Sequence, residues 1–203
     1  MSPAVPEVAG HDAGRLEALR LVRDLGYHRR DEPFRLASGQ LSHDYVDVKL
    51  AIDTGARLRV VCAAMLDLAR ALGMDPTHVG GLTMGADPLA HGIAMVDDRL
   101  GWFSVRKEPK QRGLSRWVEG ARIGPGDRVL LVDDVVTTGG SIQQAYEHVV
   151  ESGATVVGAM PVLDRGEVAR TFFLDRQIPF QGLLSYVDLG IEPIGPAQAH
   201  ATP

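Results

Sequence analysis

Two hydrophobic periods run through the chain, and each predicts a different kind of element. Apolar residues recur every three or four positions over 15–25, which predicts an amphipathic helix that ends at Gly26. The run Val129–Val132 is short and wholly apolar, as is typical of a buried parallel strand. The same patterns predict helices over 57–72, from Pro88, and over 141–150 and 168–175, and strands over 79–82, 102–105, 154–163 and 180–186. Strands that alternate with helices imply an α/β fold with a mainly parallel central sheet flanked by helices.

A hairpin is predicted ahead of this alternation. Two short apolar stretches, one around Phe34 and one over 45–48, lie on either side of a turn at Ser38-Gly39. Residues 1–13 and 193–203 are small, polar and proline-containing, so we expect flexible tails on a single domain over 14–192. The N-terminal tail lacks the basic and apolar regions of a secretory signal.

Composition narrows the class of protein. The chain has 203 residues, of which 45% are apolar and 23% charged, the ordinary globular mix for about one domain. The single Cys62 cannot form an internal disulfide, so we expect a reducing cytoplasm. The net charge of −5 argues against a nucleic-acid partner, and the sequence has no apolar run of about 18 residues that would predict a membrane span.

The most informative stretch is VLLVDDVVTTGGSIQQAYEHV, over 129–149. A predicted buried strand is followed by two acids, Asp133 and Asp134, then by a loop of threonines and glycines, then by a helix. Amides of such a loop face an anion at the positive end of the helix dipole, and hydroxyl groups add donors. The loop residues are Val135, Val136, Thr137, Thr138, Gly139, Gly140 and Ser141. This order predicts a phosphate site whose adjacent acids accept hydrogen bonds from ribose hydroxyls, and it is neither a Walker A loop nor a dinucleotide motif.

A basic stretch precedes this element. Arg106, Lys107, Lys110 and Arg112 place four cations within seven residues, with Glu108 as the acid among them. Cations in a loop that closes over a site stabilise negative charge that develops on a bound ligand. Taken alone, the run is also typical of a solvated surface loop.

These motifs resemble those of a known family. The stretch 129–149 is similar to the phosphoribosyl diphosphate (PRPP) motif of type I phosphoribosyltransferases, and three further stretches resemble orotate phosphoribosyltransferases in particular. They are FRLASGQLSHDYVDVK within a small N-terminal hood over 33–50, GGLTMGADPLA over 80–90, and VRKEPKQRGLSRWVEG, which is similar to the mobile catalytic loop, here 106–120. Ala37 and Arg112 depart from the lysine and histidine that are usual in that family.

The resemblance implies a role for each matching residue. Asp133 and Asp134 match the ribose-binding acids. Orotate contacts are implied for Thr137, for Tyr45 and Val46 in the hood, and for Arg165, which would pair with the orotate carboxylate. Arg165 is otherwise read as a surface arginine, and Tyr45 and Val46 as core residues. The implied PRPP-binding residues are Met84, Gly85, Arg106, Lys107, Lys110, Arg112 and 133–141, and the implied catalytic residues are Arg106, Lys107, Lys110, Asp133 and Asp134.

The implied activity is that of a pentosyltransferase, which transfers phosphoribosyl from PRPP to orotate and releases orotidine 5′-monophosphate and pyrophosphate, in pyrimidine biosynthesis. The resemblance also implies Mg²⁺ held through PRPP near Asp133 and Asp134, without a direct protein ligand. It implies a cytoplasmic homodimer in which Lys110 reaches the partner subunit's site. Two alternatives stay open, a phosphoribosyltransferase for another base and a catalytically weak regulator that senses PRPP.

Overall fold

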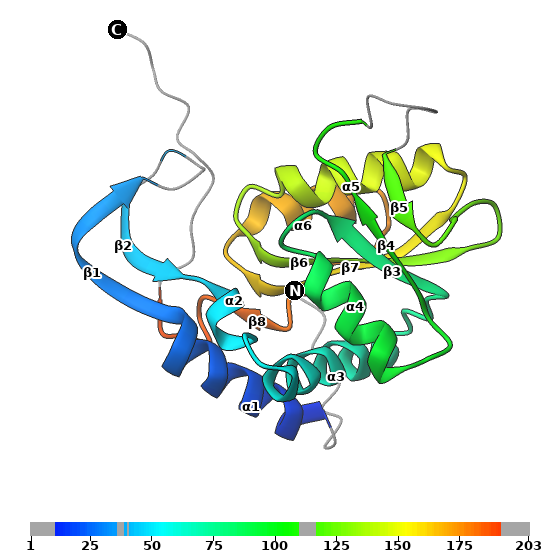
Figure 1. Cartoon of the computed structure of the whole chain (residues 1–203). Coiled ribbons are helices and arrows are strands. Elements are labelled where there is room, and N and C mark those ends of the chain that lie inside the picture. Colours follow the sequence, from blue (N-terminus) through cyan, green and yellow to red (C-terminus); the bar gives the residue numbers. More distant parts are fainter. Residues whose placement is uncertain (1–10, 36–38, 40, 110–116, 192–203) are drawn as a thin grey trace, which may run out of the picture.

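A computed structural model of the chain describes residues 11–35, 39, 41–109 and 117–191 (Figure 1). Within these residues a short π-helical turn, η1 (Val22–Gly26), follows the first helix. The helices are α1 (His11–Leu21), α2 (Val48–Ala51), α3 (Gly55–Ala71), α4 (Asp87–Val96), α5 (Gly140–Glu151) and α6 (Glu167–Leu174). The strands are β1 (Tyr27–Arg35), β2 (Leu41–Val46), β3 (His78–Leu82), β4 (Gly101–Val105), β5 (Val118–Gly120), β6 (Arg128–Val136), β7 (Thr155–Asp164) and β8 (Leu184–Ser185).

The central sheet has the strand order β5-β4-β3-β6-β7-β8. Each neighbouring pair is parallel except β4 and β5, which are antiparallel, so the predicted mainly parallel α/β fold is confirmed. Helices cover both faces, with α1, α3 and α4 on one and α5 and α6 on the other (Figure 1). Along β6 the side chains alternate between these layers, because successive residues of a strand point to opposite faces. Leu130 packs in the core with α3 and α4, and Leu131 in the core with α5 and α6.

Strands β1 and β2 form a separate antiparallel hairpin beside the main sheet (Figure 1). The chain returns from it to the domain through Asp47, whose amide donates to Gly26 O at 2.9 Å. The Asp47 side chain also caps α2 by accepting from Lys49 N at 3.0 Å. Lys49, in the first turn of α2, is thereby brought towards the end of the central sheet.

The structure differs from the sequence predictions at several boundaries. Helix α1 begins at His11, inside the segment expected to be a tail, and β5 was not predicted, because three residues show no readable alternation. Strand β6 runs on to Val136, past the acids that were expected to end it, since main-chain pairing with β7 continues as far as Asp164. Among the described residues no helix is both long and apolar enough to cross a membrane.

Candidate active site

Several of the predicted site residues lie at one edge of the central sheet. Strands β3, β4, β6 and β7 run parallel, so their carboxyl ends meet at that edge, where open α/β sheets bind ligands. The structure therefore places on one side four groups that are far apart in sequence. These are Met84 and Gly85 after β3, Arg106 and Lys107 after β4, Asp133 and Asp134 near the carboxyl end of β6, and Arg165 after β7.

The two acids of β6 have different surroundings. Asp133 is buried, and one of its oxygens accepts from Asp134 N at 3.0 Å. Asp134 is more open, and its Oδ2 lies 2.6 Å from Lys49 Nζ. Lys49 Nζ also lies 3.3 Å from Asp47 Oδ1, so the lysine is shared between the hairpin's exit and the sheet.

Burial and the neighbouring charge of Asp134 raise the pKa of Asp133 above its ordinary value, and Lys49 opposes this shift. Burial lowers the pKa of Lys49, but its contacts with Asp134 and Asp47 outweigh that effect and raise it. Lys49 is therefore the counter-charge of a close pair of carboxyl groups, one of them buried. The carboxylate oxygens of such a pair can accept hydrogen bonds from vicinal hydroxyls.

The loop after β6 surrounds a pocket of about 210 Å³. Gly139 adopts φ +82°, and a Cβ there would come 2.6 Å from Ala169 Cβ, so the turn into α5 requires glycine. Gly140 begins α5, which places the free amides of the helix beside the pocket. The lining residues are Asp133 and 135–141, which are the residues predicted to bind phosphate, together with the first acid.

The loop after β3 packs directly on the acids. A Cβ on Gly85 would lie 2.6 Å from Asp134 Oδ1 and 2.7 Å from Asp133 Oδ1, so glycine is what permits this approach. Met84 beside it is 71% exposed and open to a ligand. Asp87, at the start of α4, holds the loop in place, because its carboxylate accepts hydrogen bonds from the hydroxyls of Thr83 and Ser104, both at 2.6 Å.

The basic stretch after β4 begins at the same edge. Arg106 Nε donates to Glu108 O at 3.2 Å, its Nη1 lies 3.5 Å from Glu119 Oε1, and Lys107 is exposed. Because the Arg106 side chain is also partly exposed, both cations can face an anion above the acids. Lys110 and Arg112, the other two predicted cations, lie outside the described residues.

Arg165 is buried, with 6% of its surface exposed, which rules out the surface alternative. Its Nη2 donates to Asp44 O at 3.3 Å, its guanidinium lies 4.5 Å from the ring centre of Tyr186, and its Nε has no hydrogen-bond partner among the described residues. Burial lowers its pKa to about 10, although the negative charge of Asp44 opposes the shift. A cation that is still ionised at neutral pH thus lies buried beside the hairpin, with unused donor capacity.

The two predicted hood residues behave differently. Tyr45 is 40% exposed and meets Phe34 edge-on at 5.6 Å between ring centres, whereas Val46 is buried in the core. Tyr45 is thus available to a ligand, and the orotate contact expected for Val46 stays a prediction.

Lys49 was missed as a site residue by the sequence analysis. It was visible only as the last residue of the hood stretch, and no local pattern indicates that it meets an acid 85 positions away. Among the residues that the structure describes, no group of three or more His, Cys, Asp or Glu side chains could hold a metal ion.

Comparisons with known proteins agree with this geometry. The family model for a phosphoribosyl transferase domain matches residues 51–170, more than half of the chain. The chain is 38% identical to the orotate phosphoribosyltransferase of Aquifex aeolicus over 180 residues, which cover 86% of this chain and 97% of that protein. The crystal structure of Mycobacterium tuberculosis orotate phosphoribosyltransferase with Fe(III) dicitrate superposes with a TM-score of 0.75 at 34% identity, covering 88% of this chain and 99% of that one. The same enzyme with PRPP gives a TM-score of 0.71 at 33% identity, with the same coverage of both chains. The chain therefore belongs to the phosphoribosyl transferase family, among the orotate phosphoribosyltransferases.

Proposed function

We propose that the protein transfers the 5-phosphoribosyl group of PRPP to orotate, giving orotidine 5′-monophosphate and pyrophosphate. The observation that carries this assignment is Arg165, a buried guanidinium that no carboxylate side chain of the described residues pairs with. Orotate is a pyrimidine with a carboxylate, and a guanidinium binds a carboxylate through two parallel hydrogen bonds. Arg165 follows β7, the strand next to the one that bears the acids, so both substrates would meet at one edge.

The phosphate loop and the acids suit PRPP. The 5-phosphate fits the pocket at the start of α5, where amides and hydroxyls converge, and the ribose hydroxyls then reach Asp133 and Asp134. The pyrophosphate would extend towards Met84, Arg106 and Lys107. The M. tuberculosis enzyme that this chain resembles has been crystallised with PRPP, which supports the same placement here.

The chemistry needs no protein nucleophile. The bond from the anomeric carbon to pyrophosphate loosens, the ribose gains oxocarbenium character, and the ring nitrogen of orotate takes its place. Arg106 and Lys107 would stabilise the charge that develops on the leaving pyrophosphate. Arg165 and Tyr45 would orient orotate on the opposite side of the ribose, so the residues act by position and charge.

Mg²⁺ fits this site when it is bound to the substrate PRPP. Among the described residues no group of three or more His, Cys, Asp or Glu side chains could hold a metal ion, and Asp134 is already paired with Lys49, so the described part of the chain offers a hard cation few ligands of its own. Mg²⁺ bound to PRPP near Asp133 and Asp134 would neutralise pyrophosphate charge. The chain's part is to accept the ribose hydroxyls and keep the acids in place.

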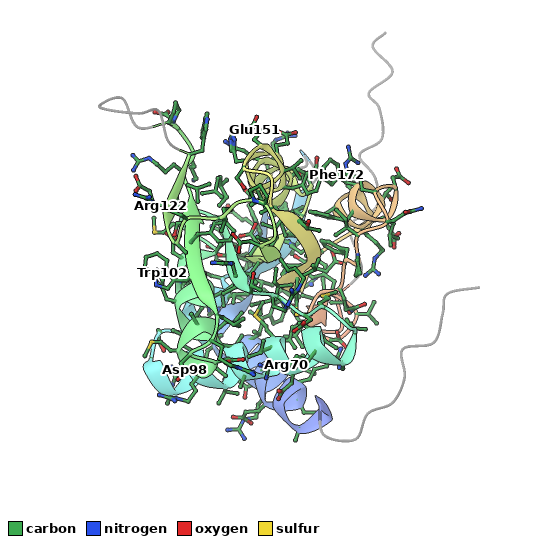
Figure 2. The ribbon with its side chains drawn as sticks, turned by 90° about the vertical axis from the view of Figure 1, so that its right-hand side faces the viewer. Arg70, Asp98, Trp102, Arg122, Glu151 and Phe172 are labelled. Carbon is green, nitrogen blue, oxygen red and sulfur yellow. The ribbon has the colours of Figure 1, made fainter. Side chains whose placement is uncertain are left out.

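We further propose a homodimer in the cytoplasm, with Lys110 reaching the partner subunit's site. The exposed apolar side chains of Met95 and Trp102 support an association surface on the α4 side, and Figure 2 shows Trp102 along the sheet edge. Mixing Lys110→Ala with Arg165→Ala subunits tests the arrangement. If Lys110 acts across the interface, each mixed dimer has one complete site and activity returns, whereas a lysine acting in its own subunit gives no rescue.

The assignment is tested by orotate absorbance loss with the purified protein, PRPP and Mg²⁺. Uracil, hypoxanthine and adenine are run in parallel, with pyrophosphate release as a second readout. We expect loss of orotate that requires both PRPP and Mg²⁺. If pyrophosphate is released only with another base, the enzyme is a phosphoribosyltransferase for that base. If no base reacts although PRPP binds, a PRPP-sensing regulator is favoured.

A further inference from the structure

The outer side of α5 contacts both ends of the basic segment that follows β4. Gln144 Nε2 donates a long hydrogen bond to Lys107 O at 3.4 Å, at the beginning of that segment. One turn further along the helix, the ring of His148 stacks on Trp117, where the described chain resumes, with ring centres 4.0 Å apart and planes 15° apart. Positions i and i+4 of a helix lie on one face, so the two contacts act side by side.

These contacts form a closed circuit through the main chain. Trp117 O accepts from Arg106 N at 2.8 Å, and Arg106 precedes Lys107, whose carbonyl returns to Gln144. The circuit thus runs from α5 through the stacked Trp117 to Arg106 and Lys107, and back to α5. Each of these residues therefore contacts another residue of the circuit.

His148 is itself held in place. Only 11% of its side chain is exposed, and its Nδ1 lies 2.8 Å from Glu151 Oε2, one turn further along α5. Figure 2 shows Glu151 at the opposite end of the molecule from α1 and α3, on the outer layer. Because the orientation of the His148 ring is fixed, the stacked Trp117 ring is held in one position as well.

We propose that Gln144 and His148 are positioning residues, which set the place of Arg106 and Lys107 relative to the phosphate loop. The inference rests on the proposed function for its kinetic consequence. Helix α5 carries the phosphate pocket at its first turn, from Gly140, and the two contacts further along its length. One rigid element therefore fixes the distance between the group that binds the 5-phosphate and the cations that meet the pyrophosphate. A displacement of about 1 Å there is costly to the chemical step.

The kinetic test compares single and double variants. We expect His148→Ala to lower kcat about tenfold while the KM for orotate stays within about twofold, because the variant misplaces cations without touching the base. His148→Phe keeps a stacked ring and is expected to restore kcat to within about twofold of the parent. Glu147→Ala, on the exposed side of the same helix, is the matched control. Equal kcat values for His148→Ala and Glu147→Ala, or a loss in His148→Phe as large as in His148→Ala, overturn the proposal.

A double-mutant cycle tests the circuit. Gln144→Ala and His148→Ala break the same ring, so their combined effect on kcat should be clearly smaller than the product of the single effects. Two unrelated structural defects would multiply instead, and that outcome contradicts the circuit. Thermal unfolding of each variant confirms that it folds.

A binding test separates this inference from the proposed reaction. The chain has two tryptophans, so Trp102→Phe leaves Trp117 as the single tryptophan, whose emission is excited selectively over that of tyrosine. We expect Mg-pyrophosphate to change Trp117 emission in this background and the change to disappear with His148→Ala. A change that is the same with and without His148 overturns the positioning role, whatever base the enzyme uses. A protein that shows the expected emission response but no orotate turnover would contradict the proposed function alone.

Discussion

The ammonium group of Lys49 lies 2.6 Å from Asp134 Oδ2 and joins the hairpin's return segment to the end of β6. The two residues are separated by 85 positions in the sequence, and one stands in the first turn of α2, the other at the edge of the central sheet. The contact supplies the positive charge that an acid pair in a partly buried site requires. Lys49 is therefore the counter-charge of the acid pair in the candidate site.

Replacement of Lys49 by methionine is expected to raise the KM for PRPP about tenfold, the scale of one charge-assisted hydrogen bond. Without the lysine the pKa of Asp133 rises further, and the pair accepts ribose hydroxyls less well. Half of the Lys49 side chain is exposed, so the free energy of unfolding should change by less than about 1 kcal/mol. Steady-state kinetics and urea unfolding check both parts, and Lys49→Arg should stay near the parent. An unchanged KM would show that Asp134 does not need this partner.

Asp133→Asn is expected to stabilise the fold at neutral pH. The pKa of Asp133 is raised in the folded protein, chiefly by burial, so the folded state binds a proton that the unfolded chain releases. Stability contributed by this group is therefore present below the ordinary aspartate pKa and is lost as pH rises towards the raised value. Asparagine keeps the acceptor oxygen for Asp134 N without that loss.

The measurement is the melting temperature of Asp133→Asn and its parent across pH. We expect the variant to melt a few degrees higher at about pH 7.5, with the difference closing towards about pH 4. Asp67→Asn on the exposed side of α3 is the control and should follow the parent. A difference that does not depend on pH would argue against a raised pKa.

Gly85→Ala tests the close approach of the β3 loop to the acids. A methyl group would come within 2.7 Å of carboxylate oxygens on both Asp133 and Asp134, so the acids must move. We expect kcat/KM for PRPP to fall about 100-fold, since a shift of this size misplaces the groups that face the ribose. Gly55→Ala at the start of α3 has open space and is the control. Activity at the control's level would show that the loop yields instead.

The sequence alone predicted the features that depend on the order of residues within a short stretch. The run from Val129 to Ser141 predicted a strand, an acid pair and a phosphate loop in that order, and the structure places the loop residues around one pocket. The parallel sheet followed from the alternation of strands and helices. Burial of Arg165 did not follow, because a strand-to-helix turn is equally typical of a surface arginine.

The contacts that the sequence did not predict join distant segments. Lys49 meets Asp134, and Gln144 meets Lys107, only because the sheet order brings their elements together. Strand β5 also depends on such pairing, since its three residues gain their conformation from β4. Side-chain pairing across a fold depends on register and twist, which no periodicity in a single sequence specifies.

Arg165 supports the sharpest prediction about specificity. Arg165→Met removes a buried cation that has no carboxylate side-chain partner among the described residues, so the fold should tolerate the change. The loss of a bidentate charged contact should lower kcat/KM for orotate by about 100-fold or more. Uracil has the same ring without the carboxylate, so its low rate should be nearly unaffected. The preference for orotate over uracil, measured as a ratio of kcat/KM values, should therefore collapse.

Two further variants decide the cause of that collapse. Arg165→Lys keeps the charge but not the planar fork, and we expect an intermediate loss for orotate. Tyr186→Phe, beneath the guanidinium, keeps the ring face and should retain the preference. Equal losses for orotate and uracil in Arg165→Met would mean that the arginine acts in the transfer step or stabilises the fold. A melting curve distinguishes these two roles. A retained preference would mean that the carboxylate is recognised elsewhere, because only a residue that contacts the carboxylate can distinguish the two pyrimidines by its charge.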